Sequence, residues 1–564
     1  MAEGSGTNES LRFQIMADGN RRREAPLATA GVPQVEVKPE DLVNVVKVLE
    51  EIVDRVLRTA SVSPVEVHPP LIGTYTGRVP VSVRIRDLFA QRLEKLDRLR
   101  TKGIEPFGGA FETSGSIAEI RAKFKEGERM RAAGRVTAHR DMGKSHFLDL
   151  EDATGRIQLY FSVTETSKKL LEIVDNLDIG DFVGAEGECF FTRTKEPTMK
   201  TRELQMLAKS LRPLPDKWHG LRDVEARYRQ RYLDLLTNER SRVVFEKRVA
   251  IIRETRRFFE ERGFLEVETP ILQTIAGGAA AEPFRTHHKA LGLDLYLRIA
   301  PELYLKRLLV GGFNKVFEIN RNFRNEGISR KHNPEFTMLE AYWAYADFEK
   351  MANLVEEPIC HLAEVIYGCL QIEHRDADGK ITRTINLERP WRRARYHDLV
   401  REVAGADWFD LSSKQRREKC TQLRVQISPE MADFQVTQQV FEKQVEDKTF
   451  DPLFVTHCPK ELVPLAKQNS EDKSLVDVFE LIINGQEIAP GYSELNDPIK
   501  QRERLEHQIG EGRQSIDEDF LLALDYGMPP AGGVGVGIDR LTMLLTGAES
   551  IRDVILFPLL RPKK

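Results

Sequence analysis

The sequence predicts a multidomain fold, with a small β-barrel followed by a larger α+β domain built from antiparallel hairpins. Three observations carry this prediction. The chain has 564 residues, more than one hydrophobic core normally serves, so about two or three domains are expected. Short strand-like segments separated by turn signals occupy residues 130–212. Beyond residue 240, amphipathic helices alternate with strands whose turns mark hairpins.

Composition is typical of a globular protein in a reducing compartment. Hydrophobic residues make up 41% of the chain and charged residues 30%. The net charge of −4 excludes a general basic coat, but local basic patches could still bind nucleic acid. The five cysteines have no CxxC spacing, which argues against a disulfide framework or structural zinc. Neither an apolar signal segment nor a membrane-spanning run is present, so we expect a cytoplasmic protein without a membrane partner.

Residues 1–81 are expected to be an N-terminal extension, and residues 82–129 a helical lead-in. The first 39 residues are polar and aperiodic, which is typical of disorder. An apolar stripe at helical spacing then runs from Leu42 to Leu57, after the capping candidate Asp41. Docking of this helix on its own protein is favoured over an RNA-binding arm, which stays open.

The segment 130–212 contains five short strands and one helix, a pattern that fits a Greek-key barrel of the OB type. Such barrels bind single-stranded nucleic acid by stacking bases on aromatic rings inside a basic groove. Arg140 and Phe147 fit that role, and Gln158 could read a base edge. The alternative is that Phe147 belongs to the core and the arginines form a solvated face.

Residues 316–345 predict a hairpin with a functional face. A strand starts at Val316, turn-forming residues follow, and a second strand starts at Glu335. Alternation places Phe336, Met338, Glu340 and Tyr342 on one face of the second strand. Before the turn, Arg324 offers a fork for phosphate or carboxylate, with Glu326 on the same face. A surface hairpin with ordinary ion pairs is an equally acceptable interpretation of this composition.

A second hairpin carries two carboxylates. Asn484-Gly485 is the strongest two-residue hairpin signal, and it pairs Ile482 with Glu487. Glu480 then lies diagonally from Glu487, with β-carbons roughly 7–8 Å apart. Two carboxylates so placed can hold Mg²⁺ together with substrate phosphates. A general acid/base pair and an exposed sheet face are the alternatives, and the metal site is favoured.

The third feature is the alternating glycine and valine strand Gly532–Gly537, followed by a helix from Ile538 to Gly547. The glycines leave one strand face bare, so a flat ring could lie against it, with Arg540 in the first turn of the helix. Close packing of the strand is the alternative explanation of the glycines.

The segments Arg324–Gly327 and His332–Thr337 together resemble motif 2 of the class II aminoacyl-tRNA synthetases, with the lysyl branch as the nearest match. Residues 241–270 resemble motif 1, and residues 532–541 resemble motif 3. The resemblance covers roughly residues 82–564. It implies an OB-fold anticodon-binding domain at 130–212, a linker at 213–240 and an α+β catalytic domain on an antiparallel sheet at 241–564.

The resemblance also implies a reaction and a set of site residues. The expected enzyme activates L-lysine with ATP to lysyl-adenylate and pyrophosphate, then transfers lysine to the 3′ end of tRNA(Lys). It would be a homodimer, with Mg²⁺ as cofactor. Arg324 and Arg540 would be catalytic. The nucleotide would contact Arg324, Glu326, His332, Asn333, Phe336, Glu480, Glu487 and Arg540, with Glu480 and Glu487 as metal ligands. Lysine would contact Gly278, Glu302, Arg324, Glu340, Tyr342, Tyr492 and Glu494. The anticodon would contact Arg140, Phe147, Gln158 and Glu196.

The charge of the pocket favours lysine, because a buried ammonium group needs paired acceptors. One departure from the family pattern is Pro490, where asparagine is usual. Proline cannot donate a hydrogen bond, so we expect weaker lysine binding or a replacement donor. Two rival functions remain: an enzyme that lysylates proteins, against which the barrel argues, and a non-catalytic RNA-binding protein, against which intact motif residues argue.

Overall fold

The structure is a computed structural model that describes residues 81–215, 221, 223–279, 281–376, 378–463, 466–510 and 516–562. The helix expected at 42–57 lies outside these residues. Val81–Lys564 forms one of two units of the chain. None of the helices in the described ranges is long and apolar enough to cross a membrane.

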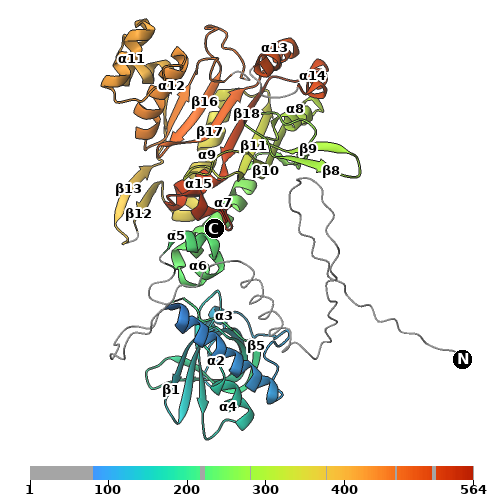
Figure 1. Ribbon diagram of the computed structural model, residues 1–564, viewed down its shortest axis with the longest axis vertical. Coiled ribbons are helices and arrows are strands. Elements are labelled where there is room, and N and C mark those ends of the chain that lie inside the picture. Colours follow the sequence, from blue (N-terminus) through green and yellow to red (C-terminus); the bar gives the residue numbers. More distant parts are fainter. Residues whose placement is uncertain are drawn as a thin grey trace, which may run out of the picture. The chain divides into compact units, whose positions relative to one another are not determined.

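The first part of this unit is a closed five-stranded barrel, as the sequence predicted. The strands pair in the order β1-β2-β3-β5-β4 (Figure 1). Alternate side chains such as Leu148, Leu150, Ile157 and Leu159 fill its interior. The expected helix is α4, whose first turn is capped by Ser167. The elements of this part are α2 (Val81–Thr101), α3 (Ile117–Ala122), β1 (Arg129–Asp141), β2 (Ser145–Glu151), β3 (Arg156–Ser162), α4 (Lys168–Asp175), β4 (Phe182–Phe191) and β5 (Pro197–Ala208).

The larger part is built on an eight-stranded, mostly antiparallel sheet in the order β14-β15-β16-β17-β18-β11-β10-β6. Both predicted hairpins are present as adjacent strand pairs, β10–β11 and β16–β17. The glycine strand β18 lies between them and joins β17 to β11. The strands are β6 (Leu265–Glu266), β10 (Lys315–Phe323), β11 (Glu335–Ala344), β14 (Arg392–Arg395), β15 (Leu453–Thr456), β16 (Val478–Ile483), β17 (Gln486–Ser493) and β18 (Ala531–Gly537).

One face of this sheet carries the main hydrophobic core. Helices α7 (Glu239–Glu261), α9 (Phe348–Tyr367) and α15 (Ile538–Thr546) pack there. Side chains of alternate strand positions, among them Leu339, Ala341, Val534 and Val536, fill the interface. α7 ends before Gly263 and α15 ends before Gly547, both at positive φ, as their sequences predicted. The opposite face of the sheet is therefore left for the polar residues.

The remaining elements flank the sheet. Helices α10–α12 bury a separate apolar cluster against β14–β16, and α8 packs with α14 beside β10 and β11 (Figure 1). The bounds are α5 (Val224–Arg229), α6 (Arg231–Thr237), β7 (Leu272–Gln273), β8 (Arg285–His288), β9 (Leu293–Leu297), α8 (Glu302–Val310), β12 (Gln371–Arg375), β13 (Ile381–Asn386), α10 (Tyr396–Ala404), η1 (Trp408–Asp410), α11 (Ser413–Gln422), α12 (Asp433–Gln444), η2 (Glu446–Lys448), α13 (Pro498–Gly510), α14 (Glu518–Asp525) and α16 (Ile551–Val554).

Candidate active site

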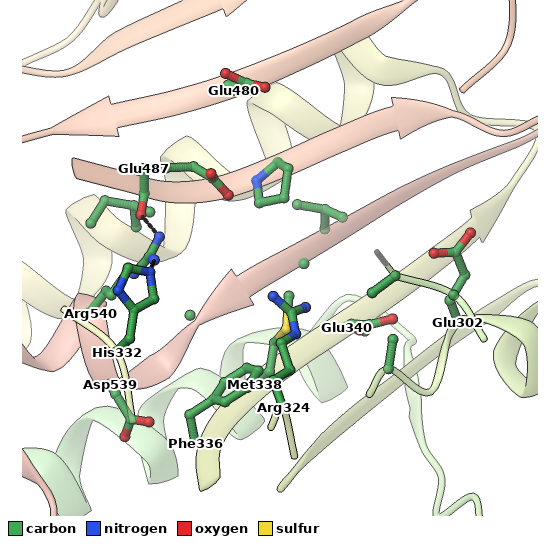
Figure 2. A pocket seen from close by; sticks show the side chains of 18 of the residues that line it. Glu302, Arg324, His332, Phe336, Met338, Glu340, Glu480, Glu487, Asp539 and Arg540 are labelled. Carbon is green, nitrogen blue, oxygen red and sulfur yellow. Dashed lines mark hydrogen bonds between the residues drawn. The ribbon is translucent and has the colours of Figure 1, made fainter. Parts of the chain in front are cut away.

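A cavity of about 400 Å³ opens on the polar face of the sheet, a size that suits a small-molecule site. It gathers every residue that the sequence assigned to ATP, metal or lysine. Figure 2 shows Arg540 and His332 beside Glu487 at one end, Glu302 and Glu340 at the other, and Arg324 between them. The gathered residues are Gly278, Glu302, Arg324, Glu326, His332, Asn333, Phe336, Glu340, Tyr342, Glu480, Glu487, Tyr492, Glu494 and Arg540.

The alternation of β11 builds the floor of this cavity. Phe336, Met338, Glu340 and Tyr342 line it, while Leu339 and Ala341 enter the core. The guanidinium of Arg324 lies 5.1 Å from the centre of the Phe336 ring. Its Nε is buried and has no hydrogen-bond partner. The hairpin is therefore not a surface hairpin with ordinary ion pairs, and Arg324 keeps donor capacity for a bound anion.

Cationic and polar groups gather at the end near Arg540. Arg540 donates to the carbonyl of Glu487 at 2.8 Å and lies 3.3 Å from Nε2 of His332 (Figure 2). Burial and the charge of Arg540 lower the pKa of His332, so the ring is neutral at physiological pH. The Oδ1 of Asn333 is buried without a donor. These groups leave hydrogen-bonding capacity that suits a nucleotide.

The carboxylate hairpin has the predicted turn and a different register beyond it. Asn484 and Gly485 both have positive φ, and Ile482 pairs with Glu487 as expected. A β-bulge then places Ala489 opposite Leu481. Pro490, rather than Ala489, therefore lies opposite Glu480, so the assumed regular diagonal was wrong in detail. A bulge adds a residue that no two-residue period reveals.

Glu480 and Glu487 both line the cavity, from neighbouring strands (Figure 2). Burial and the nearby charge of Glu487 raise the pKa of Glu480 to about 8. Among the described residues neither carboxylate forms a salt bridge, and the charges that act on Glu480 are those of Glu487, Glu446 and Glu442. The described residues hold no group of three or more histidine, cysteine or acidic side chains arranged for a metal. A hard divalent cation that completes its shell with phosphate oxygens fits this donor pair.

The glycine strand β18 is less bare than its sequence suggested. A β-carbon at Gly533 would lie 1.9 Å from Oε1 of Glu494, and one at Gly535 would lie 2.4 Å from the methyl group of Met338. At Gly537 an added β-carbon would meet Arg540 only at ordinary contact distance. The expectation of a free face for a flat ring was therefore wrong at Gly533, where Glu494 and Tyr342 fill the space, whereas Gly535 and Gly537 line the cavity.

The end near Glu302 is acidic. Burial, followed by the charge of Glu302, raises the pKa of Glu340 to about 8. Burial also raises the pKa of Glu494 to about 7, and Oε1 of Glu494 has no partner. The hydroxyl of Tyr342 donates to Glu340 at 3.2 Å. The three glutamates make this end a site for cations.

The sequence reasoning missed two buried cations behind this face. Lys306 forms ion pairs of 2.6 Å with Glu302 and 2.5 Å with Glu494. Arg248 of α7 pairs with Asp539 at 2.6 Å, and Asp539 also accepts from the backbone N–H of Thr337 at 2.8 Å. The i,i+4 spacing of Glu302 and Lys306 was a readable signal for the first pair.

Pro490 also lines the cavity. In β17, only Gly491 to Ser493 pair with β18. Pro490, which has no backbone N–H, lies just before the first of these pairs. Position 490 therefore faces the site, and the loss of a donor to the substrate carboxylate stays a prediction.

The residues predicted to contact the anticodon lie together on the barrel. Phe147 is half-buried, not a core residue, and its ring packs 5.1 Å from that of Tyr160. Asp149 pairs with Arg140 at 2.6 Å and with Arg156 at 3.0 Å. Gln158 accepts from Thr198 at 3.0 Å, and Glu196 lies 3.8 Å from Arg156. The barrel surface thus presents an aromatic pair beside polar groups.

Comparison with known families agrees with this geometry. The family model described as "tRNA synthetases class II (D, K and N)" matches residues 223–561. A model of the OB-fold nucleic acid binding domain matches residues 130–214. The chain therefore belongs to the class II tRNA synthetases, with an OB-fold domain ahead of the catalytic domain.

Within that family the chain belongs to the lysine–tRNA ligase branch. It is 50% identical over 491 residues to a lysine–tRNA ligase of Pelotomaculum thermopropionicum, covering 85% of this chain and 96% of the relative. The ligase of Carboxydothermus hydrogenoformans is 49% identical over 488 residues, with 85% and 99% covered. That of Bacillus cereus is 46% identical over 496 residues, with 85% and 98% covered.

Proposed function

We propose that the protein activates L-lysine with ATP and transfers it to tRNA(Lys), as an AMP-forming lysine–tRNA ligase. One observation carries this proposal: a single cavity has an acidic end that suits ammonium groups and an opposite end where Arg540, His332 and Asn333 suit a nucleotide. Arg324 lies between the two ends (Figure 2). This is the arrangement that joins a cationic amino acid to a nucleotide.

Lysine would lie at the acidic end. Glu302 beside Gly278 receives the α-ammonium group, while Glu494, Glu340 and Tyr342 receive the side-chain ammonium group. Tyr492 packs along the chain of methylene groups. An aspartate or asparagine substrate would leave these carboxylates buried without a cation, which is costly. The same cost excludes most other amino acids.

ATP would occupy the other end. Phe336 and Arg540 hold the adenine between them, and Glu326, His332 and Asn333 contact the nucleotide. Glu480 and Glu487 would hold Mg²⁺, because these two carboxylates line the same end of the cavity from neighbouring strands. When bound, Mg²⁺ neutralises phosphate charge and orients the phosphates.

The chemistry then rests on position and charge. The lysine carboxylate attacks the α-phosphorus in line, and pyrophosphate leaves. Arg324 would contact both the carboxylate and the α-phosphate, and so hold the reacting atoms together while stabilising the charge that develops. The terminal ribose hydroxyl of tRNA then attacks the carbonyl of the adenylate and releases AMP.

The tRNA and a second subunit complete the proposal. Arg140, Phe147, Gln158 and Glu196 would contact the anticodon on the barrel, where an aromatic surface is available for base stacking. A homodimer would cover the exposed apolar side chains of Val249 on α7 and of Leu265 and Leu272 on β6 and β7. We place the enzyme in the cytoplasm, which suits its five free cysteines.

Aminoacylation of tRNA transcripts tests this function. Incubation with lysine, ATP and Mg²⁺ should charge a transcript with a lysine anticodon, and a matched transcript with an exchanged anticodon should be charged more slowly. Charging of both transcripts at one rate would reject the anticodon assignment. Lysine attached to protein but not to tRNA would favour the protein-lysylating enzyme.

A further inference from the structure

Lys306 is a fully buried cation at the back of the acidic end. It follows Glu302 by one turn of α8 and is 1% exposed. Its ammonium lies 2.6 Å from Oε1 of Glu302 and 2.5 Å from Oε2 of Glu494. It joins two carboxylates that come from segments nearly 200 residues apart in the sequence.

Lys306 does not line the cavity, although both of its carboxylate partners do. It therefore approaches these glutamates from behind the wall of the site. A side chain that merely substituted for an absent substrate would project into the cavity itself. Lys306 is thus a permanent part of the wall.

The two ion pairs use one oxygen of each glutamate. Oε1 of Glu494 remains buried without a hydrogen-bond partner. Oε2 of Glu302 lies on the side of Gly278, where an added β-carbon would come within 3.7 Å of it. One oxygen of each carboxylate is therefore held and the other is left for a ligand.

The charges at this end also require an internal cation. Three carboxylates surround a site that receives two ammonium groups from lysine. Lys306 supplies a third positive charge, which matches the number of carboxylates. Among the residues that the structure describes, the other charged or titratable groups facing this cluster are Tyr342 of β11, Tyr492 of β17, Arg298 and Arg324.

Burial alone would favour neutral acids here, and a neutral acid binds an ammonium group poorly. Lys306 lowers the pKa of Glu494, although burial still leaves that pKa at about 7. Burial opposes the charge of Lys306, but Glu302 and Glu494 more than offset this and raise its pKa. The cation and the two anions therefore stabilise each other's charged forms.

We propose that Lys306 is a positioning residue for lysine recognition, which holds one oxygen each of Glu302 and Glu494 and leaves the other oxygen of each for the substrate's ammonium groups. The inference rests on the proposed function, since it concerns the same site. It assigns to Lys306 a role that acts through its two partners and not through contact with the substrate.

The test is Lys306→Met, which keeps the length of the side chain and removes the charge, measured by lysine-dependent ATP–pyrophosphate exchange. We expect the KM for lysine at pH 7 to rise at least about tenfold, with the KM for ATP nearly unchanged. The increase should shrink as the pH rises, because the pKa of Glu494 is raised further once Lys306 is absent, and at higher pH this carboxyl ionises without the cation. An unchanged KM for lysine, or an increase independent of pH, would overturn the inference.

Arg307→Met is the matched control, because it removes a neighbouring cation of the same helix that pairs with Asp517 at 2.7 Å. It should lower the melting temperature without changing the KM for lysine. Absence of lysine-dependent exchange by the wild-type protein would reject the proposed function itself. Normal exchange by the wild type, with a wild-type KM in Lys306→Met, would reject only the role of Lys306.

A measurement on the unmodified protein covers the case in which Lys306→Met does not fold. Calorimetry of lysine binding at about pH 8, in buffers of different ionisation enthalpy, counts the protons released. If Lys306 keeps Glu494 ionised, only Glu340 releases protons, and fewer than about one proton per site appears. Release approaching two protons would mean that Glu494 is protonated in the empty site, and would overturn the inference.

Discussion

The chemistry of the site depends on acids whose burial is only partly compensated. Glu340 accepts one hydrogen bond from Tyr342, and Glu494 forms one ion pair with Lys306. Burial raises the pKa of both carboxyl groups. In the proposed site, the ammonium groups of the substrate offset the unfavourable burial of these two carboxylates. Selectivity for lysine then follows, because an amino acid without a second ammonium group leaves the buried carboxylates unpaired.

The pH dependence of lysine binding follows from these raised pKa values. Glu340, with a pKa of about 8, and Glu494, with a pKa of about 7, are progressively protonated as the pH falls below those values. Protonated acids do not attract an ammonium group, so the KM for lysine should rise as the pH falls from about 8.5 to 6.5. Exchange kinetics over that range measure it. A lysine KM that is flat, or that falls with acidification, would contradict this, and the KM for ATP is the internal reference.

Pro490 gives a second prediction at the residue scale. Pro490→Asn restores a side-chain donor that faces the cavity, and should lower the KM for lysine by about tenfold if it reaches the substrate carboxylate. Pro490→Ala is the control, because it restores only the backbone N–H. A KM for lysine that is unchanged or higher in Pro490→Asn would mean that another group already replaces the donor.

At the scale of elements, the strand β18 joins the two hairpins and sets the shape of the pocket. Gly533 and Gly535 have no β-carbon, so the side chains of Glu494 and Met338 can lie against the strand. The two glycines therefore determine the shape of the lysine end. Alternation along β11 and β18, the helix bounds and the hairpin turn were all predicted, because periods and turn residues are local properties of sequence. The bulge in β17 was not, because it depends on the pairing of strands.

Gly533→Ala tests the shape of this strand. Its β-carbon would overlap Glu494, so lysine-dependent exchange should fall at least about tenfold, and stability should fall by about 1–3 kcal/mol. Gly537→Ala, whose β-carbon meets Arg540 only at 3.7 Å, should have a smaller effect. Equal effects of the two changes on the KM for lysine would show that Gly533 does not shape the lysine end.

The barrel can be tested separately from the catalytic sheet. Phe147→Ala removes one ring of a tilted aromatic pair and should weaken tRNA binding by about 1–3 kcal/mol, with pyrophosphate exchange unchanged. Phe182→Ala is the control, since this ring of the same barrel is exposed and already covered by Arg135 at 4.2 Å. Filter binding of tRNA measures both. Equal losses would show that Phe147 has no special place in recognition.

At the scale of the whole molecule, sequence motifs located the residues of the site, and the fold supplied their partners. Gly278, Arg324, Glu480 and Arg540 come from four segments that are far apart in the sequence, and all four line one cavity. The family resemblance predicted that they meet, whereas no local sequence pattern did. The ion pair of Lys306 with Glu494 was missed, because long-range pairing leaves no local signal. The occupation of the glycine face by Met338 was missed for the same reason.

The central claim is that this one pocket adenylates lysine and no other amino acid. Amino-acid-dependent ATP–pyrophosphate exchange with Mg²⁺, measured across the twenty amino acids, tests it most directly. The account predicts exchange with lysine alone, because only lysine brings two ammonium groups to the acidic end. Exchange with a different amino acid would contradict the assignment of Glu302, Glu340 and Glu494, and exchange with none would contradict the proposed catalysis.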